Sequence, residues 1–531
     1  MNSRARIALG LVLVVAASLI AAPAVAQNEP TVENPIIVES FDGTPIVATL
    51  MLPAGASDTS PVPVILYTHG WGGTRITSAT GTAESLLEKG YAVFTWDARG
   101  FGDSGGEANI DSVEFEVKDV QALMDYLAGR PEIELDKPGD PRMGWIGGSY
   151  AGGIQLQTAG IDHRVDAIVP EIAWADLPRS LTPNGVFKRN WNYLLYGSGA
   201  ATGTVNGLDS PAGPQTGVYA PEIHQAFAEI NATGTLSGRL LEWFEARSTI
   251  LRTPDITAPT MLVQGTVDTL FPLEEAFDHY KILKRNGVPV KLMTYCGGHT
   301  GNLVHPSLGA NCPGGTSGYP DGGDGSIYEA RRLAWLDRYV KGLKVSTGPE
   351  LEWQAQDGYY YGGTRFPLPA TKMVSTETIS SSLAGPGTTG GDGPLEGNPA
   401  PQYEQGAVAA SADVFSSKHA MSVVGIPRVE LKGTVNGLSG ILFLKLVDVG
   451  PDGEAVTVND QTMPLRLEGG AFEVTVDLHG VTWLLQPGHT LQLEVSTGST
   501  QYDFNRMGPY SVDFEATTYL PLAPAPTSKA V

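Results

Sequence analysis

An apolar run that ends in a serine among small residues restricts the fold of this chain more than any other feature. Residues 143–146 are mostly apolar, and they lead through Gly147 and Gly148 into Ser149. The sequence that follows, residues 150–153, is compatible with a helix. A strand, a sharp turn at a serine and a helix form a nucleophile elbow, in which the hydroxyl projects above the end of a sheet. The string therefore predicts a strand–turn–helix unit with Ser149 as a candidate nucleophile.

The match to the elbow pattern G-x-S-x-G is imperfect. Ala151 occupies the second position after the serine, and the expected glycine follows one place later at Gly152. Alanine is small enough for the close packing that the elbow needs. A glycine-rich strand end can also be an ordinary βα turn, so the string alone leaves both interpretations open.

Apolar runs of strand length alternate with stretches of helical periodicity between residues 35 and 343. This alternation is typical of an α/β fold with a mainly parallel sheet. The expected strands span residues 62–67, 91–96, 142–146, 165–169, 258–263 and 288–295. The expected helices span residues 80–88, 113–127, 273–283 and 327–340, where apolar side chains recur every three or four residues.

Asp268 and His299 complete a candidate triad. Asp268 follows the expected strand 258–263, and His299 follows the strand 288–295. Groups at the carboxyl ends of parallel strands converge on one crevice, and the chain order Ser, acid, His is that of α/β-hydrolases. Imidazole can take a proton from a serine hydroxyl near neutral pH, and an aspartate holds the ring tautomer. We therefore predict Ser149 as nucleophile, His299 as general base and Asp268 as its orienting acid.

Three other residues compete for these roles. His305 lies further from the strand end than His299 and directly precedes a proline. His69 precedes the serine, which is the wrong chain order for the base in this fold. Asp278 falls within an expected helix, where exposure to solvent is the usual outcome for an aspartate.

Two backbone N–H groups are expected to form an oxyanion hole. One belongs to Tyr150, directly after the nucleophile, and the other to Trp71 in the glycine-rich loop 69–73. A second glycine-rich turn, residues 97–104, is interpreted as structural.

A long segment, about residues 171–256, separates two expected strands and predicts a helical cap, because such connections usually have only a few residues. The segment is rich in aromatic side chains: Trp174, Phe187, Trp191, Tyr193, Tyr196, Trp243 and Phe244. These side chains either line a substrate pocket or form the core of the cap itself.

The sequence pattern changes after residue 343. Short segments in which apolar and polar residues alternate are there separated by turns rich in Gly, Pro and Asp. Residues 441–447, 472–476 and 491–495 are typical strands of an all-β sandwich. We therefore expect a catalytic domain over residues 27–345 and a β-sandwich domain over residues 346–531.

With these motifs placed, the chain resembles the X-prolyl dipeptidyl peptidase and cocaine esterase family. The resemblance rests on residues 147–152, on the 97–104 turn, on the contexts of Asp268 and His299, and on the C-terminal segments 441–449 and 485–489. It implies a jelly-roll-like C-terminal domain that closes over the site, and cleavage of esters or of amides after proline. Many members carry a tyrosine where this chain has Trp71, so the resemblance does not supply a side-chain oxyanion donor.

Peptidase activity would require a carboxylate that pairs with the free amino group of the substrate. Glu171 is the best candidate, with Asp176 behind it, and Trp174 is a candidate substrate contact. The alternative is that Glu171 is a structural acid, which is a common reason for a buried carboxylate.

The first 26 residues have the pattern of a secretory signal peptide. Arg4 and Arg6 precede an apolar run, residues 7–20, and Ala24-Val25-Ala26 forms a small-residue cleavage site. The run is shorter than a membrane span needs. Cleavage after Ala26 would place the mature protein outside the cell.

The net charge and the cysteine content limit which binding partners, disulfides and cofactors we expect. The formal net charge of −23 disfavours binding to nucleic acid or to an anionic membrane. The two cysteines, Cys296 and Cys312, predict one disulfide in an exported chain, with buried thiols as the alternative. No metal-binding spacing accompanies the cysteines, so no metal is expected. Hydrolysis through an acyl-enzyme on Ser149 needs no organic cofactor, and none is expected.

The leading hypothesis is therefore a secreted serine hydrolase that cleaves acyl esters or X-Pro amides through an acyl-enzyme on Ser149. The alternative is a non-catalytic extracellular binding protein that uses the β-sandwich to bind carbohydrate or a surface. The sequence leaves the oligomeric state open.

Overall fold

The computed structural model describes residues 29–213, 218–299, 325–369, 371–376, 378–385 and 408–527. The expected signal peptide, His305 and Cys312 lie outside these residues. Within the described part of the chain, no helix is both long and apolar enough to cross a bilayer.

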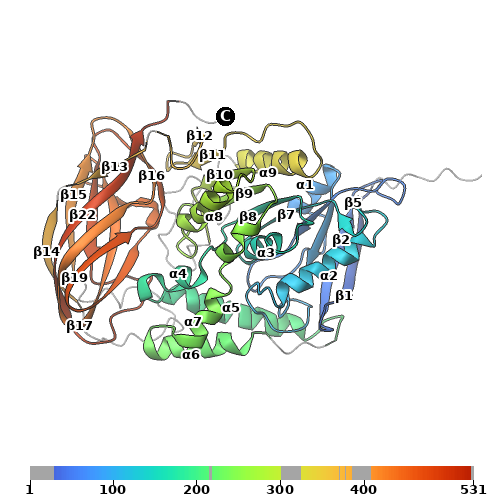
Figure 1. The fold of residues 1–531 in the computed structure, drawn as a ribbon, viewed down its shortest axis with the longest axis horizontal. Helices are drawn as coiled ribbons and strands as arrows, with labels where there is room; N and C mark the ends of the chain where they lie inside the picture. Colours follow the sequence, from blue (N-terminus) through green and yellow to red (C-terminus); the bar gives the residue numbers. More distant parts are fainter. Residues whose placement is uncertain are drawn as a thin grey trace, which may run out of the picture.

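The N-terminal part, the α/β domain, is built on a ten-stranded sheet (Figure 1). The strand order is β1-β2-β4-β3-β7-β8-β9-β10-β11-β12, and the strands from β4 to β11 in this order run parallel. The strands are β1 (Thr31–Glu39), β2 (Pro45–Leu52), β3 (Val64–Tyr67), β4 (Ala92–Trp96), β7 (Met143–Gly148), β8 (Ala167–Glu171), β9 (Thr260–Gly265), β10 (Val290–Tyr295), β11 (Leu351–Gln354) and β12 (Tyr360–Gly363). A separate hairpin pairs β5 (Leu135–Lys137) with β6 (Asp140–Pro141).

Helices cover both faces of this sheet. They are α1 (Thr82–Glu88), α2 (Glu116–Ala128), α3 (Tyr150–Ala159), α8 (Leu273–Arg285) and α9 (Gly325–Tyr339). One core contains side chains of α2, α3 and α8, and another contains those of α1 and α9. Val64 and Leu66 of β3 enter the first core and Ile65 the second, because side chains alternate along a strand. A strand buried on both faces must be apolar throughout, which is why the central strands were recognisable in the sequence.

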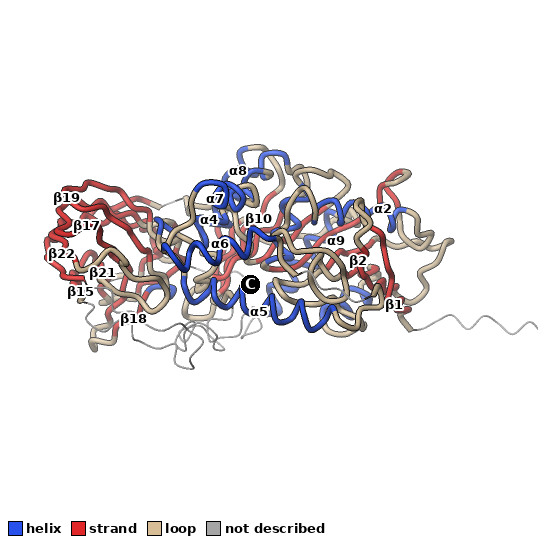
Figure 2. The backbone as a smooth tube through the Cα atoms, turned by 90° about the horizontal axis from the view of Figure 1, so that it is seen from below, coloured by secondary structure: helices blue, strands red, loops and turns tan. Residues whose placement is uncertain are grey.

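The predicted cap lies between β8 and β9. Its helices are α4 (Leu177–Leu181), α5 (Arg189–Gly207), α6 (Pro221–Thr233) and α7 (Gly238–Glu245), with 3₁₀ turns η1 (Pro183–Gly185), η2 (Thr249–Leu251) and η3 (Thr253–Asp255). Helices α5 and α6 lie at the bottom of the molecule in Figure 1 and face the viewer in Figure 2, which is seen from below. Cap side chains share a core with Ala98, Tyr150 and Phe271 of the α/β domain.

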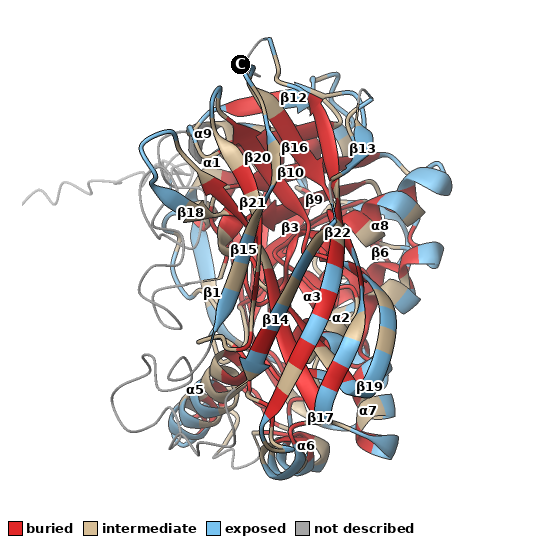
Figure 3. Cartoon of the chain, turned by 90° about the vertical axis from the view of Figure 1, so that its left-hand side faces the viewer, coloured by how far each residue is buried: buried red, intermediate tan, exposed pale blue. Residues whose placement is uncertain are grey.

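The C-terminal domain, residues 372–527, is an antiparallel sheet that curls on itself. Its strands are β13 (Lys372–Ser375), β14 (Ile379–Gly385), β15 (Ala409–Ser416), β16 (Met421–Gly425), β17 (Arg428–Val449), β18 (Ala455–Thr457), β19 (Met463–Asp477), β20 (Val481–Leu485), β21 (Thr490–Ser496) and β22 (Tyr510–Pro524). The long strand β17 pairs with β22 near its start and with β21 near its end. Buried and exposed residues alternate along β22 (Figure 3), so one face of the curl encloses the core.

Two parts of the first sheet were not anticipated. Strands β1 and β2 add an antiparallel edge, and β11 and β12 extend the sheet past residue 345, where the sequence analysis ends the catalytic domain. Beyond them, Val424 and Leu484 of the C-terminal domain enter the same core as Phe277 of α8. The two domains therefore share apolar packing.

Candidate active site

Ser149 lies at the turn between β7 and α3. Its backbone has φ 58° and ψ −122°, a conformation that a residue with a side chain rarely adopts. The Ser149 N–H donates to Glu171 O at 2.9 Å, and Ser149 O accepts from Gly152 N and Gly153 N at 2.8 and 2.9 Å. The strand, the strained serine and the helix thus have the geometry of a nucleophile elbow.

The small residues around the serine are required by close contacts. A Cβ atom on Gly147 would lie 2.8 Å from the Cβ of Ala151, so the glycine makes room for the alanine. A Cβ atom on Gly152 would lie 2.8 Å from Glu171 O on the next strand. These contacts explain why the imperfect pattern, with alanine in place of the expected glycine, still forms the turn.

Asp268 and His299 are in direct contact. Asp268 Oδ2 lies 2.6 Å from His299 Nδ1, and the Asp268 side chain is fully buried. Its other oxygen, Oδ1, accepts from the backbone N–H groups of Leu270 and Phe271 at 3.0 and 2.9 Å. The carboxylate is therefore fixed in orientation, and its contact with Nδ1 favours the tautomer in which Nε2 carries the free lone pair.

His299 Nε2 is buried and has no hydrogen-bond partner within the described part of the chain. The ring is held edge-on by Phe271 and Trp191, whose ring centroids lie 5.2 and 5.8 Å away. His299 Nε2 is thus available to take a proton from a hydroxyl, which is the role predicted for it toward Ser149.

A pocket opens at Ser149. Most of its wall comes from the cap, including Leu195, Tyr196, Ile223, Ala226, Phe227 and Phe244. Trp71, Ile110, Tyr150 and Phe271 contribute from the α/β domain, and Trp174 lies at the start of the cap. None of the described residues that line the pocket is Asp, Glu, Lys, Arg or His, so the pocket favours an apolar group.

The two expected oxyanion donors lie beside the serine. A Cβ atom on Gly70, the neighbour of Trp71, would lie 3.8 Å from Ser149 Cβ, and Tyr150 begins α3, where a backbone N–H has no partner within the helix. The Trp71 indole Nε1 donates to Leu195 O at 2.9 Å, and the ring stacks on Tyr219. The indole thus anchors the cap, which leaves the backbone N–H of Trp71 as its candidate donor.

Glu171 does not line the pocket. It is buried, and it accepts from the Tyr328 hydroxyl and lies 3.9 Å from Arg332 Nη1, both on α9. Burial raises the pKa of Glu171, while Arg332 and Tyr328 oppose that rise. Asp176 caps α4 by accepting from Arg179 N at 3.0 Å. In the described structure, neither carboxylate is placed to meet a substrate amine at the pocket, whereas Trp174 does line it.

Two acids lie behind Tyr150 and are shielded from water. Burial raises the pKa of Asp111 well above its ordinary value, and it raises the pKa of Glu116 to about 7 although Asn109 and Ser112 donate backbone hydrogen bonds. The Tyr150 hydroxyl lies 3.4 Å from Glu116 Oε1. Burial of both acids behind Tyr150 thus disfavours their charged forms.

The competing residues have other functions. His69 is buried, its Nε2 accepts from Ala98 N at 2.9 Å, and burial lowers its pKa. Asp278 forms ion pairs with Arg179 and Lys281 on the outside of α8. The side chains of His69 and Asp278 are thus engaged in other contacts, and Asp268 and His299 remain the candidates for acid and base.

Three further residues hold the loop that carries Asp268; of these, the sequence analysis names only Trp191, and only as one of several cap aromatics. Lys188 is buried and donates from Nζ to Leu270 O at 2.9 Å; burial lowers its pKa to about 8. Trp191 Nε1 donates to Thr269 Oγ1 at 2.8 Å. Gln461, from the C-terminal domain, donates to Asp268 O at 3.0 Å. They come from the cap and from a separate domain, and no local motif marks such contacts.

Comparisons with known proteins cover nearly all of the chain. The family model for X-Pro dipeptidyl-peptidase (S15 family) matches residues 42–301. The model for the X-Pro dipeptidyl-peptidase C-terminal non-catalytic domain matches residues 346–528. Cocaine esterase from Rhodococcus sp. is 24% identical, over 90% of this chain and 92% of the esterase.

Solved structures share the arrangement of domains. A CocE/NonD family hydrolase from Staphylococcus aureus aligns with a TM-score of 0.65 at 14% sequence identity, covering 93% of each chain. An α-amino acid ester hydrolase aligns with a TM-score of 0.69 at 14% identity, covering 95% of this chain and all of the other. The predicted α/β-hydrolase fold with a β-rich C-terminal domain is thereby confirmed.

Proposed function

Because the chain belongs to the X-Pro dipeptidyl-peptidase and cocaine esterase family of serine hydrolases, we propose that it hydrolyses carboxylic esters with a bulky apolar acyl group. The observation that carries this proposal is the apolar pocket that opens at Ser149. Burial of an apolar acyl chain in such a pocket contributes about 0.8 kcal/mol per methylene.

In the proposed reaction, Ser149 Oγ attacks the ester carbonyl carbon while His299 Nε2 takes the hydroxyl proton. Asp268 stabilises the resulting imidazolium through Nδ1. The backbone N–H groups of Tyr150 and Trp71 stabilise the oxyanion of the tetrahedral intermediate. Its collapse releases the alcohol, which receives the proton, and water then hydrolyses the acyl-enzyme by the same steps in reverse order.

An ester substrate is favoured over an X-Pro peptide by the surroundings of the pocket. A dipeptidyl peptidase needs a group that binds the charged amino terminus of its substrate, and a buried ammonium without a partner is very costly. Glu171 and Asp176 are already engaged in contacts within the protein. Among the described residues, the pocket lining offers an amine no carboxylate.

A panel of p-nitrophenyl esters tests this proposal. We expect kcat/KM for the hexanoate to exceed that for the acetate by about tenfold or more, because the longer chain buries more apolar surface. Ala226→Phe should remove most of this preference, since Ala226 is buried on α6 and lines the pocket. Ala228→Phe is the matched control, because Ala228 is exposed on the same helix. If alanyl-prolyl p-nitroanilide is turned over with an equal or higher kcat/KM, the ester proposal is wrong.

We also propose that the protein is exported and that Cys296 pairs with Cys312. The support is the N-terminal signal pattern and the position of Cys296 between β10 and His299. Protein recovered from the culture medium should begin at Gln27, and its cysteines should react with an alkylating agent only after reduction. An intact N-terminus would contradict the export proposal, and alkylation without reduction would contradict the disulfide.

A further inference from the structure

The loop that carries Asp268, residues 266–271, is held by donors from outside itself; we call it the acid loop. Gln461 Nε2 donates to Thr266 O at 3.2 Å and to Asp268 O at 3.0 Å, Trp191 Nε1 to Thr269 Oγ1 at 2.8 Å, Lys188 Nζ to Leu270 O at 2.9 Å, and Gln264 Nε2 to Phe271 O at 2.6 Å. These donors belong to the C-terminal domain, the cap and strand β9. The acid loop is therefore the place where three parts of the protein meet.

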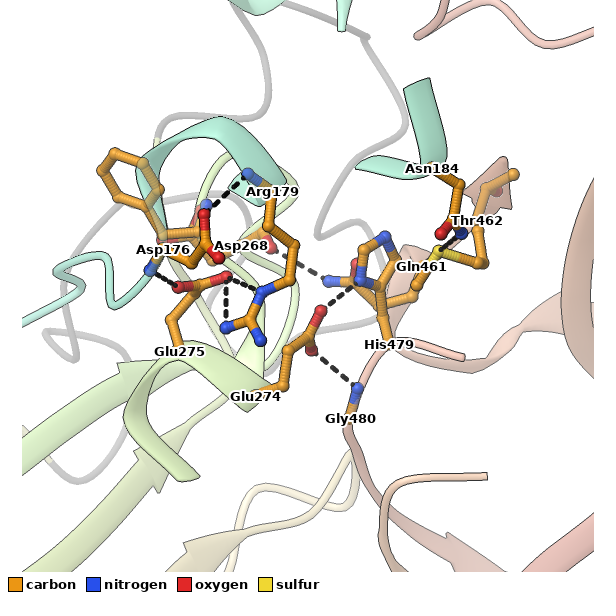
Figure 4. Close-up of polar contacts among 12 residues, drawn as sticks. Asp176, Arg179, Asn184, Asp268, Glu274, Glu275, Gln461, Thr462, His479 and Gly480 are labelled. Carbon is orange, nitrogen blue, oxygen red and sulfur yellow. Dashed lines mark hydrogen bonds and ion pairs between the residues drawn. The ribbon is translucent and has the colours of Figure 1, made fainter. Parts of the chain in front are cut away.

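Gln461 is the one of these donors that comes from the C-terminal domain. It follows the 3₁₀ turn η5 (Val458–Asp460) and is 6% exposed. The turn is fixed within its own domain, because Asn459 Oδ1 accepts from Thr482 N on β20 at 3.0 Å. Figure 4 shows the Gln461 amide directed at Asp268 across the domain boundary.

A second contact fixes the same boundary directly after the acid loop. Glu274, in the first turn of α8, accepts from His479 Nδ1 at 2.6 Å and from Gly480 N at 2.9 Å (Figure 4). Burial alone would raise the pKa of Glu274, but the charge and hydrogen bond of His479 outweigh it and lower the pKa to about 2. The carboxylate is thus charged at neutral pH, and it anchors the C-terminal domain at the start of α8.

We propose that Gln461 is a positioning residue for Asp268, so that the docked C-terminal domain sets the geometry of the triad. The amide binds the backbone carbonyl of Asp268 itself, and a shift of this carbonyl moves the carboxylate relative to His299 Nδ1. Small displacements matter, since a misplacement of about 1 Å can cost about 10²-fold in rate. The inference rests on the proposed role of Asp268 in ester hydrolysis.

The chain offers a matched control for a purely structural role. Gln356, which follows β11, also spans the domain boundary: its Nε2 donates to Leu484 O at 2.7 Å and its Oε1 accepts from Leu484 N at 3.0 Å. Gln461 and Gln356 are therefore both interdomain glutamines with two hydrogen bonds, but only Gln461 contacts the acid loop. Gln356→Leu should destabilise the interface without moving Asp268.

The experiment compares kcat, KM and melting temperature for hexanoate ester hydrolysis by the full-length Gln461→Leu and Gln356→Leu enzymes. We expect Gln461→Leu to lower kcat about tenfold with KM changed by less than about twofold, because Gln461 does not itself line the pocket, whereas a shift of Asp268 misaligns the base. Gln356→Leu should keep the wild-type kcat even if its melting temperature falls as far. Equal kcat values for the two variants would overturn the proposal.

If Gln461→Leu does not fold, Gln461→Glu provides a second test of the positioning role of Gln461. The two side chains have nearly the same shape, but a carboxylate can donate to neither Thr266 O nor Asp268 O, whereas a protonated carboxyl group has one O–H that can donate to one of them. The ratio of variant to wild-type kcat should therefore rise as the pH is lowered from about 8 to about 5.5, since burial favours the neutral form. A pH-independent ratio would contradict a positioning role. If the wild-type enzyme itself hydrolyses no ester, it is the proposed function that fails.

Discussion

An Asp268→Asn enzyme should fold normally and lose about 10⁴-fold in kcat/KM, the cost typical of a triad whose acid becomes an amide. Oδ1 of Asp268 accepts from Leu270 N and Phe271 N, so the asparagine oxygen must take this place. Its NH₂ group then faces His299 Nδ1 and forces the ring proton onto Nε2. A histidine with a protonated Nε2 cannot take the proton of Ser149. Steady-state hydrolysis of the hexanoate ester measures the loss.

Two further variants test whether the loss of kcat/KM in Asp268→Asn is specific to the candidate triad. Asp278→Asn changes the competing acid on α8, which pairs with Arg179 and Lys281, and we expect its kcat/KM to stay near the wild-type value. Ser149→Ala should abolish labelling by a fluorophosphonate, which reacts with an activated serine. Wild-type activity in Asp268→Asn, or labelling of Ser149→Ala, would refute the assigned roles.

Glu352→Ala should reduce the free energy of unfolding by about 3 to 5 kcal/mol, the range for breaking a buried ion pair. Glu352 lies on β11 and is fully buried, and it pairs with Lys291 on β10 and with Arg331 on α9. The Lys291 side chain is only 2% exposed, so removal of the carboxylate leaves a charge in the interior. Chemical denaturation monitored by tryptophan fluorescence would measure the change.

The control for this prediction is an exposed pair in the same domain. Glu222 on α6 contacts Arg239, whose side chain is 62% exposed. Because water screens such a pair, Glu222→Ala should cost at most about 1 kcal/mol. An equal loss of unfolding free energy in Glu352→Ala and Glu222→Ala would contradict the prediction that the buried ion pair contributes more to stability than the exposed one.

The central strands and the candidate triad were predictable because local sequence determines them. Strand β7 is buried on both faces and must be apolar, and the turn at Ser149 requires small neighbours. Asp268 and His299 each follow a strand of the same parallel sheet, so their convergence follows from topology.

Other features depend on contacts between distant segments and could not be predicted in this way. Strand β11 was recognisable only once its pairing with β10 was known. Glu171 is adjacent to the nucleophile elbow in the sheet, but its side chain turns to α9, and the sequence does not show this direction. Gln461 is separated from Asp268 by nearly two hundred residues, and a single glutamine in a turn carries no pattern.

The cap has a consequence for how this enzyme could change over evolutionary time. Most of the pocket wall belongs to one insertion between β8 and β9, whereas the candidate triad belongs to the strand ends of the sheet. Mutations at the pocket-lining positions of α6 and α7 can alter which acyl groups fit, whereas Lys188 and Trp191 of the same insertion hold the acid loop and must be kept. New substrates are therefore accessible through changes in α6 and α7 alone, with the reacting groups left in place.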